Sequence, residues 1–148
     1  GYLGPHRRRL RVACTGMVSI FAIAIGGAAG AVSRYGGAAA VQRLTGGLFP
    51  WGTMAVNLLG AFLIGFLSIL LGRAVVPPSL RMGLLAGFLG SFTTFSTYML
   101  ESVQLLQDGE YGAAASNLFF GNLAGLVAVL AGMFAARLLI SMLEGGAG

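Results

Sequence analysis

The sequence predicts an all-α membrane protein with four transmembrane helices, of which the third is broken near its middle. Composition points to the membrane, because 57% of the 148 residues are hydrophobic and only 9% are charged, whereas soluble domains carry about 25% charged residues. The charged residues also divide the chain into four uncharged windows. Each window reaches the roughly 18 residues that mark a candidate membrane-spanning helix.

The four windows cover residues 12–33, 44–72, 82–100 and 111–136. Turn and helix-stop residues separate them, namely Gly46-Gly47 with Pro50, Pro77-Pro78, and Gln107-Asp108-Gly109. Trp51 and Tyr111 lie at window edges, where amphipathic rings favour the headgroup level. This order predicts four helices joined by short turns.

We divide the chain into a basic N-terminal tail at residues 1–16, a four-helix membrane domain at 17–143 and a short C-terminal tail at 144–148. The first tail contains four arginines, Arg7, Arg8, Arg9 and Arg11. The apolar run that follows it lacks a convincing signal-peptide cleavage site. Met17 is an equally good start, in which case the tail is an extension; we treat it as a basic cytoplasmic tail and assign it no mechanistic role.

The remaining arginines predict little bias in orientation. With the N-terminus inside, one side of the membrane holds Arg73, Arg81 and Arg137, and the other holds Arg34 and Arg43. Such a small difference does not orient a chain firmly by the positive-inside rule. Apart from the four arginines of the tail, the core could therefore insert in both orientations, which would permit an antiparallel homodimer with its two-fold axis in the membrane plane.

Glycines at four-residue spacing predict close helix packing. The pairs are Gly26 and Gly30, Gly83 and Gly87, and Gly121 and Gly125. Each pair can serve contacts within one chain or contacts between two chains. Four helices are too few to enclose a pore, so we expect a homo-oligomer.

Polar side chains inside hydrocarbon are costly without partners and mark functional positions. In the second window Thr53 and Asn57 lie one turn apart, and Gly60 and Ala61 continue that face. This pattern is typical of a conduction path or of a close helix contact. The alternative is that Asn57 only bonds a neighbouring backbone carbonyl.

The third window contains the most informative segment, GFLGSFTTFSTY at residues 87–98. Glycine and clustered Ser and Thr favour alternatives to the helical hydrogen bond, so we expect a break at residues 90–93. At ~1.5 Å per residue this position lies about 12 to 18 Å beyond Met82, close to the mid-plane. In an antiparallel dimer two freed carbonyls from each copy converge there, a set that favours a hard cation such as Na⁺.

Two further patterns concern the path of an ion. Phe95 and Tyr98 share a helix face, and their electropositive ring edges can face a small anion, although ordinary aromatic packing is the alternative. In the fourth window Asn117 shares a small face with Gly121 and Gly125. Asn122 falls about 140° from Asn117 around the helix, so both amides cannot line one path.

Three segments resemble the Fluc (CrcB) family of fluoride channels in the expected order: GGAAGAVSRYGG at 26–37, GTMAVNLLGAFLIG at 52–65 and GFLGSFTTFSTY at 87–98. The resemblance extends from residue 17 to about residue 139. It implies a four-helix chain in the cell membrane that forms an antiparallel, dual-topology homodimer with two pores. Such a channel exports toxic fluoride from the cell.

The resemblance also implies roles for individual residues. It puts Asn57 on the fluoride pathway with Thr53 one turn before it, and it puts the ring edges of Phe95 and Tyr98 against fluoride. The remaining expected donors follow from their own polarity and not from the resemblance, with which the fourth window aligns poorly: Thr94, Ser96, Thr97 and Asn117.

The resemblance further implies that the backbone carbonyls of Gly90 and Thr93 hold a central structural Na⁺ that is not transported. Arg34 matches an arginine at the aqueous vestibule. The sequence departs from the family pattern at two positions, because Tyr98 stands where Phe is usual and Ser91 replaces the second glycine before the sodium site.

The expected function is therefore passive and selective conduction of fluoride. The alternative is a small dual-topology proton-coupled exporter, which needs a membrane carboxylate; the candidate for it is Glu101, which directly follows the third window. A purely structural subunit leaves the cluster at residues 90–98 unexplained.

An enzyme is not expected, because the sole His6 lies in the tail, Cys14 is the only cysteine, and neither a carboxylate pair nor a phosphate loop is evident. The arginines also do not form the basic face of a nucleic-acid binder.

Overall fold

The computed structural model describes residues 5–145, with side chains described from residue 16 onward. Within these residues the chain forms helices and turns but no strand. Three long helices, α1 (Pro5–Thr45), α2 (Trp51–Arg73) and α6 (Tyr111–Gly145), each contain a stretch long and apolar enough to cross a membrane. The predicted all-α class is confirmed.

The segment between α2 and α6 is discontinuous. It consists of α3 (Pro78–Met82), the π-helical η1 (Gly83–Leu89), the short α4 (Gly90–Phe92) and α5 (Phe95–Gln107). Thr93 and Thr94 separate α4 from α5. The third window is therefore broken within the Gly, Ser and Thr cluster, as predicted, but at Thr93 and Thr94 and not over the whole of residues 90–93.

Helix α1 extends further than its uncharged window in both directions. It begins at Pro5, inside the predicted tail at residues 1–16, and it continues past Arg34 to Thr45. The uncharged window ends at residue 33 because of Arg34, but the helix itself ends at Thr45, directly before the helix-stop residues Gly46 and Gly47. Residues 1–4 of the predicted N-terminal tail and residues 146–148 of the C-terminal tail lie outside the described residues.

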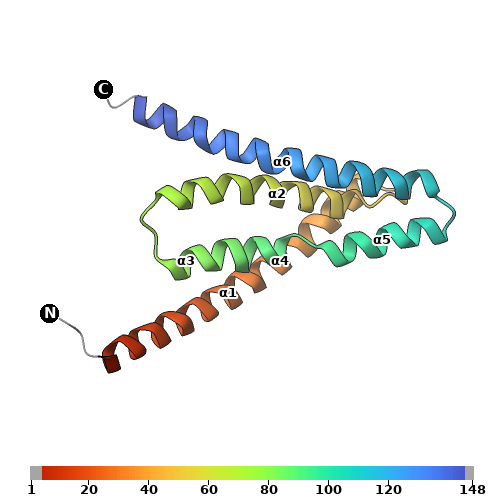
Figure 1. Ribbon diagram of the computed structural model, residues 1–148. Helices are drawn as coiled ribbons and strands as arrows, with labels where there is room; N and C mark the ends of the chain where they lie inside the picture. Colours follow the sequence, from red (N-terminus) through yellow and green to blue (C-terminus); the bar gives the residue numbers. More distant parts are fainter. Residues whose placement is uncertain (1–4, 146–148) are drawn as a thin grey trace.

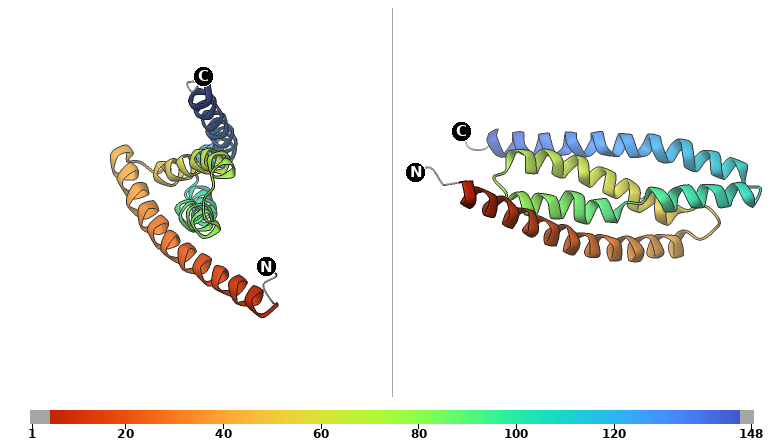
Figure 2. Two further views of the ribbon diagram at one scale, coloured as in Figure 1. Left: turned by 90° about the vertical axis from the view of Figure 1, so that its left-hand side faces the viewer. Right: turned by 60° about the horizontal axis from the view of Figure 1, so that its bottom comes forward.

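The helices form an elongated bundle (Figures 1 and 2). Helix α2 makes its most extensive contacts with α6, whereas α1 packs on η1, α3 and α4. The turns at residues 46–50 and 108–110 lie at one end of the bundle, and the turn at residues 74–77 lies at the other (Figure 1). The broken segment thus runs along the bundle between these ends.

The turn from α1 to α2 is built by two glycines and one amide side chain. Gly46 (φ 64°) and Gly47 (φ 75°) adopt the left-handed region that glycine enters without a steric cost. The Nε2 group of Gln42 donates to the carbonyls of Gly47 and Phe49, each at 3.1 Å, and its Oε1 accepts from the Gly52 N–H at 3.1 Å. Gln42 thereby fixes the angle at which α2 begins.

Glycines bring α1 and η1 into backbone contact. A Cβ atom at Gly26 would overlap the Gly83 carbonyl, one at Gly30 would overlap the Phe88 carbonyl, and one at Gly87 would lie 2.7 Å from the Ile23 carbonyl oxygen. Small residues permit this close approach in a membrane. The first two predicted glycine pairs therefore serve contacts within one chain.

The glycines of α6 divide into two groups. Gly132 packs on the Phe62 backbone of α2, and Gly65 of α2 packs on the Val129 carbonyl of α6 in the same manner. The predicted pair behaves differently, because Gly121 faces the Tyr98 ring while a Cβ at Gly125 would meet nothing within 4 Å.

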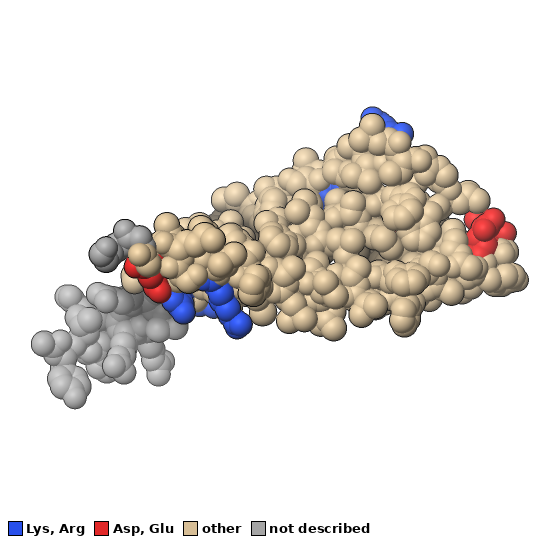
Figure 3. Space-filling view, turned by 90° about the horizontal axis from the view of Figure 1, so that it is seen from above, with Lys and Arg blue, Asp and Glu red and all other residues tan. Residues whose placement is uncertain are grey.

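Charged side chains lie mainly toward the ends of the molecule. On the face in Figure 3 acidic groups lie near both ends, and the stretch between them is almost entirely uncharged. One exposed ion pair, between Arg73 and Glu144 at 3.2 Å, joins α2 to α6. This distribution suits a molecule whose middle is surrounded by hydrocarbon.

Candidate functional site

The break in the third segment is a short extended stretch. Thr93 (φ −89°, ψ 155°) and Thr94 (φ −144°, ψ 119°) leave the helical region between α4 and α5. The N–H and the hydroxyl of Thr93 both donate to the Leu89 carbonyl, at 3.2 and 3.1 Å. In the last turn before the break, the Leu89 carbonyl therefore accepts both hydrogen bonds of Thr93.

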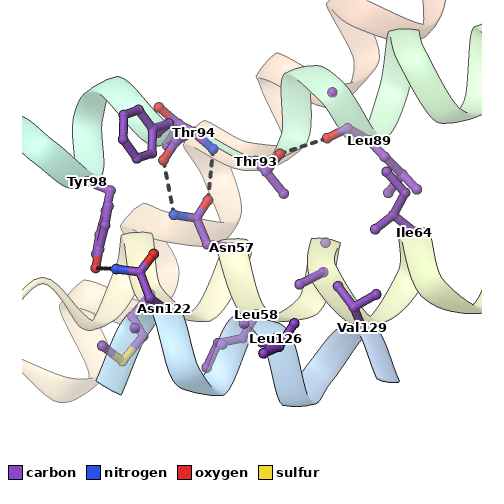
Figure 4. A pocket seen from close by; sticks show the side chains of 17 residues that line it. Asn57, Leu58, Ile64, Leu89, Thr93, Thr94, Tyr98, Asn122, Leu126 and Val129 are labelled. Atoms are coloured by element: carbon purple, nitrogen blue, oxygen red, sulfur yellow. Dashed lines mark hydrogen bonds between the residues drawn. The ribbon is translucent and has the colours of Figure 1, made fainter. Parts of the chain in front are cut away.

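Asn57 of α2 clamps the residue after the break. Its Nδ2 donates to the Thr94 carbonyl at 3.0 Å, and its Oδ1 accepts from the Thr94 N–H at 2.8 Å (Figure 4). Asn57 thus does bond a neighbouring backbone carbonyl, which was the alternative left open by the sequence. One hydrogen of its Nδ2 group is not needed for this clamp.

The hydroxyl of Thr94 starts the next helix. Its Oγ1 accepts from the Thr97 N–H at 3.2 Å and pairs with Thr97 Oγ1 at 2.9 Å. Such a side chain replaces the backbone acceptor that the first turn of a helix lacks. Helix α5 therefore begins directly behind the break.

These two contacts withdraw donors from two carbonyls. In a continuous α-helix the Thr94 N–H would bond the Gly90 carbonyl, and the Thr97 N–H would bond the Thr93 carbonyl. Here the first N–H pairs with Asn57 and the second with Thr94 Oγ1. Gly90 and Thr93, the residues expected to offer carbonyls to a cation, are thus among the residues whose helical donors are diverted at the break.

Small residues set the position of the break relative to α2. A Cβ atom on Gly60 would overlap the Thr93 methyl group. Gly90 lies on the exposed surface of the single chain. The break is therefore held tightly against α2 on one side and is open on the other.

A groove of about 470 Å³ lies beside the break, between α2, α5 and α6. We call it the break groove; its lining includes Asn57, Gly60, Gly90, Thr93, Thr94, Phe95, Tyr98 and Asn122 (Figure 4). Most of its other lining residues are apolar. The groove therefore offers a few polar groups within an otherwise apolar wall.

The two aromatic residues of the break groove are adjacent, as their spacing predicts. Their ring centroids lie 6.4 Å apart and the ring planes are tilted by 48°. Phe95 is 72% exposed in the single chain, whereas Tyr98 is only 7% exposed. One ring therefore points out of the chain and the other is built into it.

A second groove, of about 540 Å³, lies between α1, α2 and α5. We call it the Arg34 groove; it is lined by Arg34, Thr53, Thr94, Thr97 and Glu101 among others. Thr94 lines both grooves. The structure thus separates Thr53 from Asn57, since Thr53 lines the Arg34 groove and Asn57 the break groove.

Two polar contacts shape the Arg34 groove. Arg34 Nε donates to the Ser91 carbonyl at 3.1 Å, and Thr53 Oγ1 donates to Glu101 Oε1 at 2.7 Å. The second carboxylate oxygen, Oε2, is buried and has no hydrogen-bond partner among the described residues. Arg34 therefore reaches the end of the broken helix in addition to facing the groove.

Two of the predicted site residues, Asn117 and Ser96, line neither groove. Asn117 is fully buried, and its Nδ2 donates to Ser102 Oγ at 3.0 Å, which in turn donates to the Tyr98 carbonyl at 2.8 Å. Ser96 is exposed on α5. Asn117 thus connects α6 to α5 and lines neither groove.

A protein-family model described as "CrcB-like protein, Camphor Resistance (CrcB)" matches residues 21–133, which is most of the chain. The chain belongs to the CrcB-like family. The resemblance on which the site was predicted is thereby confirmed, and with its apolar helices this CrcB-like chain is a multi-pass protein of the cell membrane.

Three relatives illustrate the relationship, and each bears the name fluoride-specific ion channel FluC. The protein from Geobacter sulfurreducens is 48% identical over 122 residues, covering 82% of this chain and 98% of the relative. That from Chlorobium chlorochromatii is 45% identical, covering 80% and 92%. That from Geotalea uraniireducens is 44% identical, covering 83% and 100%. The CrcB-like chain thus matches relatives named as ion channels and not as enzymes.

Sequence reasoning missed three contacts of this CrcB-like site. They are the bond from Arg34 to Ser91, the bond from Thr53 to Glu101, and the bond from Asn122 to Tyr98. Each pair is far apart in the sequence, so local spacing carries no signal for it. The one available signal was the polarity of each residue inside an apolar segment.

Proposed function

We propose that this CrcB-like protein conducts fluoride passively out of the cell, as an antiparallel dual-topology homodimer with a structural Na⁺ at its centre. Relatives that match nearly their whole length are named fluoride-specific ion channels. The observation that carries the proposal is the break at Thr93 and Thr94, clamped by Asn57 beside Phe95. This arrangement lowers fluoride toxicity by giving the ion a route along its own gradient.

The carbonyls of Gly90 and Thr93 fit a hard cation. Their helical donors are diverted to Asn57 and Thr94, and a carbonyl without a donor is costly within a membrane. No group of three or more His, Cys, Asp or Glu residues gathers in the described part of the chain, so backbone oxygens are the ligands available there. Na⁺ bound by two carbonyls from each copy would supply a fixed positive charge that holds the copies together.

A second copy in the opposite orientation fits the open side of the break. Gly90 is exposed and Phe95 is 72% exposed in the single chain. Lipid tails can cover the phenyl ring but cannot bond a carbonyl. An inverted copy brings its own carbonyls of Gly90 and Thr93 to the same depth. This follows because a two-fold axis in the membrane plane leaves a group at the mid-plane at the mid-plane.

Fluoride is small and strongly hydrated, so a pore must replace its water with donors that release it again. The break groove provides the remaining N–H of Asn57 and the ring edge of Phe95. Thr97 adds a hydroxyl in the Arg34 groove, and Thr94 lines both grooves. We propose the Arg34 groove as the aqueous vestibule, in which Arg34 attracts the anion and Thr94 passes it toward Asn57.

Planar-bilayer recording tests this proposal. The purified protein is reconstituted between solutions that contain a fluoride gradient and equal chloride. A passive fluoride channel gives a reversal potential that follows the fluoride gradient and stays fixed when a chloride gradient is imposed. A membrane that stays silent, or a potential set by chloride, would overturn the proposal.

One observation favours a second candidate, a proton-coupled fluoride exporter. Glu101 places a half-buried carboxylate in the Arg34 groove, with Oε2 unpartnered among the described residues, and such a group can exchange protons. With equal fluoride on both sides and the voltage held at zero, a proton gradient makes an exporter accumulate fluoride on one side. The channel proposed here moves no net fluoride under that condition.

A further inference from the structure

The hydroxyl of Tyr98 is inserted into the backbone of α6. Tyr98 is only 7% exposed, and its Oη lies 2.9 Å from the Asn117 carbonyl and 3.1 Å from the Leu118 carbonyl, to which it donates. It also accepts from Asn122 Nδ2 at 3.0 Å (Figure 4). The phenol therefore uses both its donor and an acceptor position on one helix.

Asn122 is itself held in place. Its Nδ2 also donates to the Leu118 carbonyl at 2.6 Å, one turn earlier on α6. An amide has two N–H groups, so one can serve Leu118 and the other Tyr98. The hydrogen bond to Leu118 thus fixes the Asn122 side chain on its own helix, in a position from which it donates to the Tyr98 hydroxyl.

Gly121 provides the space that the hydroxyl occupies. A Cβ atom at this position would lie 3.0 Å from Tyr98 Oη and 3.1 Å from Cε2, which is closer than ordinary van der Waals contact. Gly121 therefore leaves room for Tyr98 Oη, and the amide of Asn122 donates a hydrogen bond to the same atom.

This contact fixes the long axis of the Tyr98 ring at both ends, since Cβ is held by α5 and Oη by α6. The neighbouring Phe95 ring, 6.4 Å away, is 72% exposed and carries no hydroxyl. Of the two rings beside the break groove, only the tyrosine is anchored across the groove to α6.

We propose that Asn122 is a positioning residue for ion passage. Together with Gly121 it holds the Tyr98 hydroxyl against α6, and it thereby fixes the position of the Tyr98 ring edge in the wall of the break groove. This inference rests on the proposed fluoride conduction. The role proposed for Asn122 has a specific consequence: this amide affects conduction only while residue 98 carries a hydroxyl.

A double-mutant cycle tests the inference. Fluoride efflux from liposomes is measured for the wild type, Asn122→Leu, Tyr98→Phe and the double variant. Leucine keeps the size of the amide without its donor. Loss of one hydrogen bond predicts an efflux about 2- to 10-fold lower for Asn122→Leu in the tyrosine protein. When Asn122→Leu is added to Tyr98→Phe, it changes efflux by less than about 2-fold.

Two further measurements separate positioning from a loss of folding. Gly121→Ala presses on the hydroxyl and also on the ring atom Cε2, so its effect on efflux must be smaller in the Tyr98→Phe background but need not vanish there. Ultraviolet resonance Raman difference spectra report whether a phenol accepts a hydrogen bond; Asn122→Leu must alter the tyrosine bands in the wild-type background and leave them unaltered in the Tyr98→Phe background.

The possible results are distinct. Equal losses of efflux in both backgrounds, no loss in either, or unaltered tyrosine bands would overturn the positioning role while leaving the proposed function intact. Wild-type liposomes that retain fluoride would overturn the proposed function and, with it, any role of Asn122 in conduction.

Discussion

Asn57 uses both ends of its amide on the backbone of one residue, Thr94. Each such bond contributes about 0.5 to 1.5 kcal/mol to stability, and leaving a buried partner unpaired costs about 1 to 3 kcal/mol. The side chain therefore has a structural task at the break as well as the proposed task of meeting fluoride with its remaining N–H. A substitution of Asn57 is therefore expected to affect both the stability of the break and the conduction of fluoride.

The substitution Asn57→Asp changes the amide to an acceptor-only group. The carboxylate can no longer donate to the Thr94 carbonyl, and its charge repels fluoride in the same groove. We expect fluoride efflux from liposomes to fall by at least about tenfold, since each 1.4 kcal/mol is a factor of ten. Gln107→Glu makes the same chemical change at an exposed position of α5 and serves as the control. Unimpaired efflux in the Asn57→Asp variant would show that Asn57 does not line the path.

Gly60 sets how closely the break approaches α2. A methyl group in Gly60→Ala would overlap the Thr93 methyl group, so the break must shift and the carbonyl of Thr93 moves with it. Overpacking of this kind costs about 1 to 3 kcal/mol. We expect a lower thermal unfolding temperature in detergent and reduced fluoride efflux.

The matched control for that substitution is Gly72→Ala, on the same helix, where an added Cβ meets nothing within 4 Å. Alanine there should leave both measurements unaltered or raise the unfolding temperature, because glycine is a poor helix former. Equal effects of the two substitutions would contradict a specific contact between Gly60 and Thr93.

Residue-level prediction from the sequence succeeded where the signal was local. Phe95 and Tyr98 are adjacent because they lie three positions apart on one helix, and the angle between Asn117 and Asn122 correctly separated these two amides. It could not show that Asn57 clamps Thr94, because these residues lie 37 positions apart. The partner of a polar group is a property of packing, and no spacing rule contains it.

At the level of elements, the broken third segment organises the molecule. It contains a π-helical stretch, η1, before the break, and such stretches often occur at functional sites. Arg34 of α1 crosses to the Ser91 carbonyl in α4. In an uninterrupted helix that carbonyl would accept the N–H of Phe95, so Arg34 replaces a donor that the break removes.

The substitution Arg34→Ala should therefore destabilise the break. Without the guanidinium the Ser91 carbonyl has lost both its helical donor and its replacement, at a cost of about 1 to 3 kcal/mol. The free energy of unfolding, measured by denaturant titration in detergent, should fall by that amount. Arg43→Ala removes the same side chain from an exposed position of α1 and should have little effect. Equal losses in both variants would contradict the capping role of Arg34.

The break and the end of α1 were predictable from the sequence, whereas the partner of Arg34 was not. Glycine and hydroxyl residues compete locally with helical hydrogen bonds, so the cluster at residues 90–97 carries its own signal. Gly46 and Gly47 likewise mark the end of α1, which lies at Thr45. The carbonyl that Arg34 bonds in α4 lies 57 positions away, so no local pattern contains it.

For the whole molecule, the proposed dimer explains why a single chain leaves its functional groups half covered. Gly90 and Phe95 are exposed, while the glycine pairs of α1 and η1 are already occupied within the chain. Contacts between copies must therefore use other surfaces, and Gly125 of α6, which meets nothing within 4 Å, is available for them.

Labelling from the two sides of the membrane tests the dual orientation. A cysteine at the exposed turn, Glu110→Cys in a Cys14→Ala background, is exposed to a membrane-impermeant maleimide outside sealed vesicles and then inside. We expect comparable fractions to react on each side, because the arginines outside the tail differ little between the two ends. Reaction from one side alone would contradict the antiparallel dimer.

The most direct measurement of the central claim is fluoride release from liposomes, followed with a fluoride-selective electrode. The claim is that two inverted copies of one broken helix hold a sodium ion and, beside it, conduct fluoride. It predicts rapid release from liposomes containing the protein when an ionophore compensates the charge, with slower release after Na⁺ is replaced by a large organic cation. Liposomes that hold their fluoride as tightly as protein-free ones would contradict the claim.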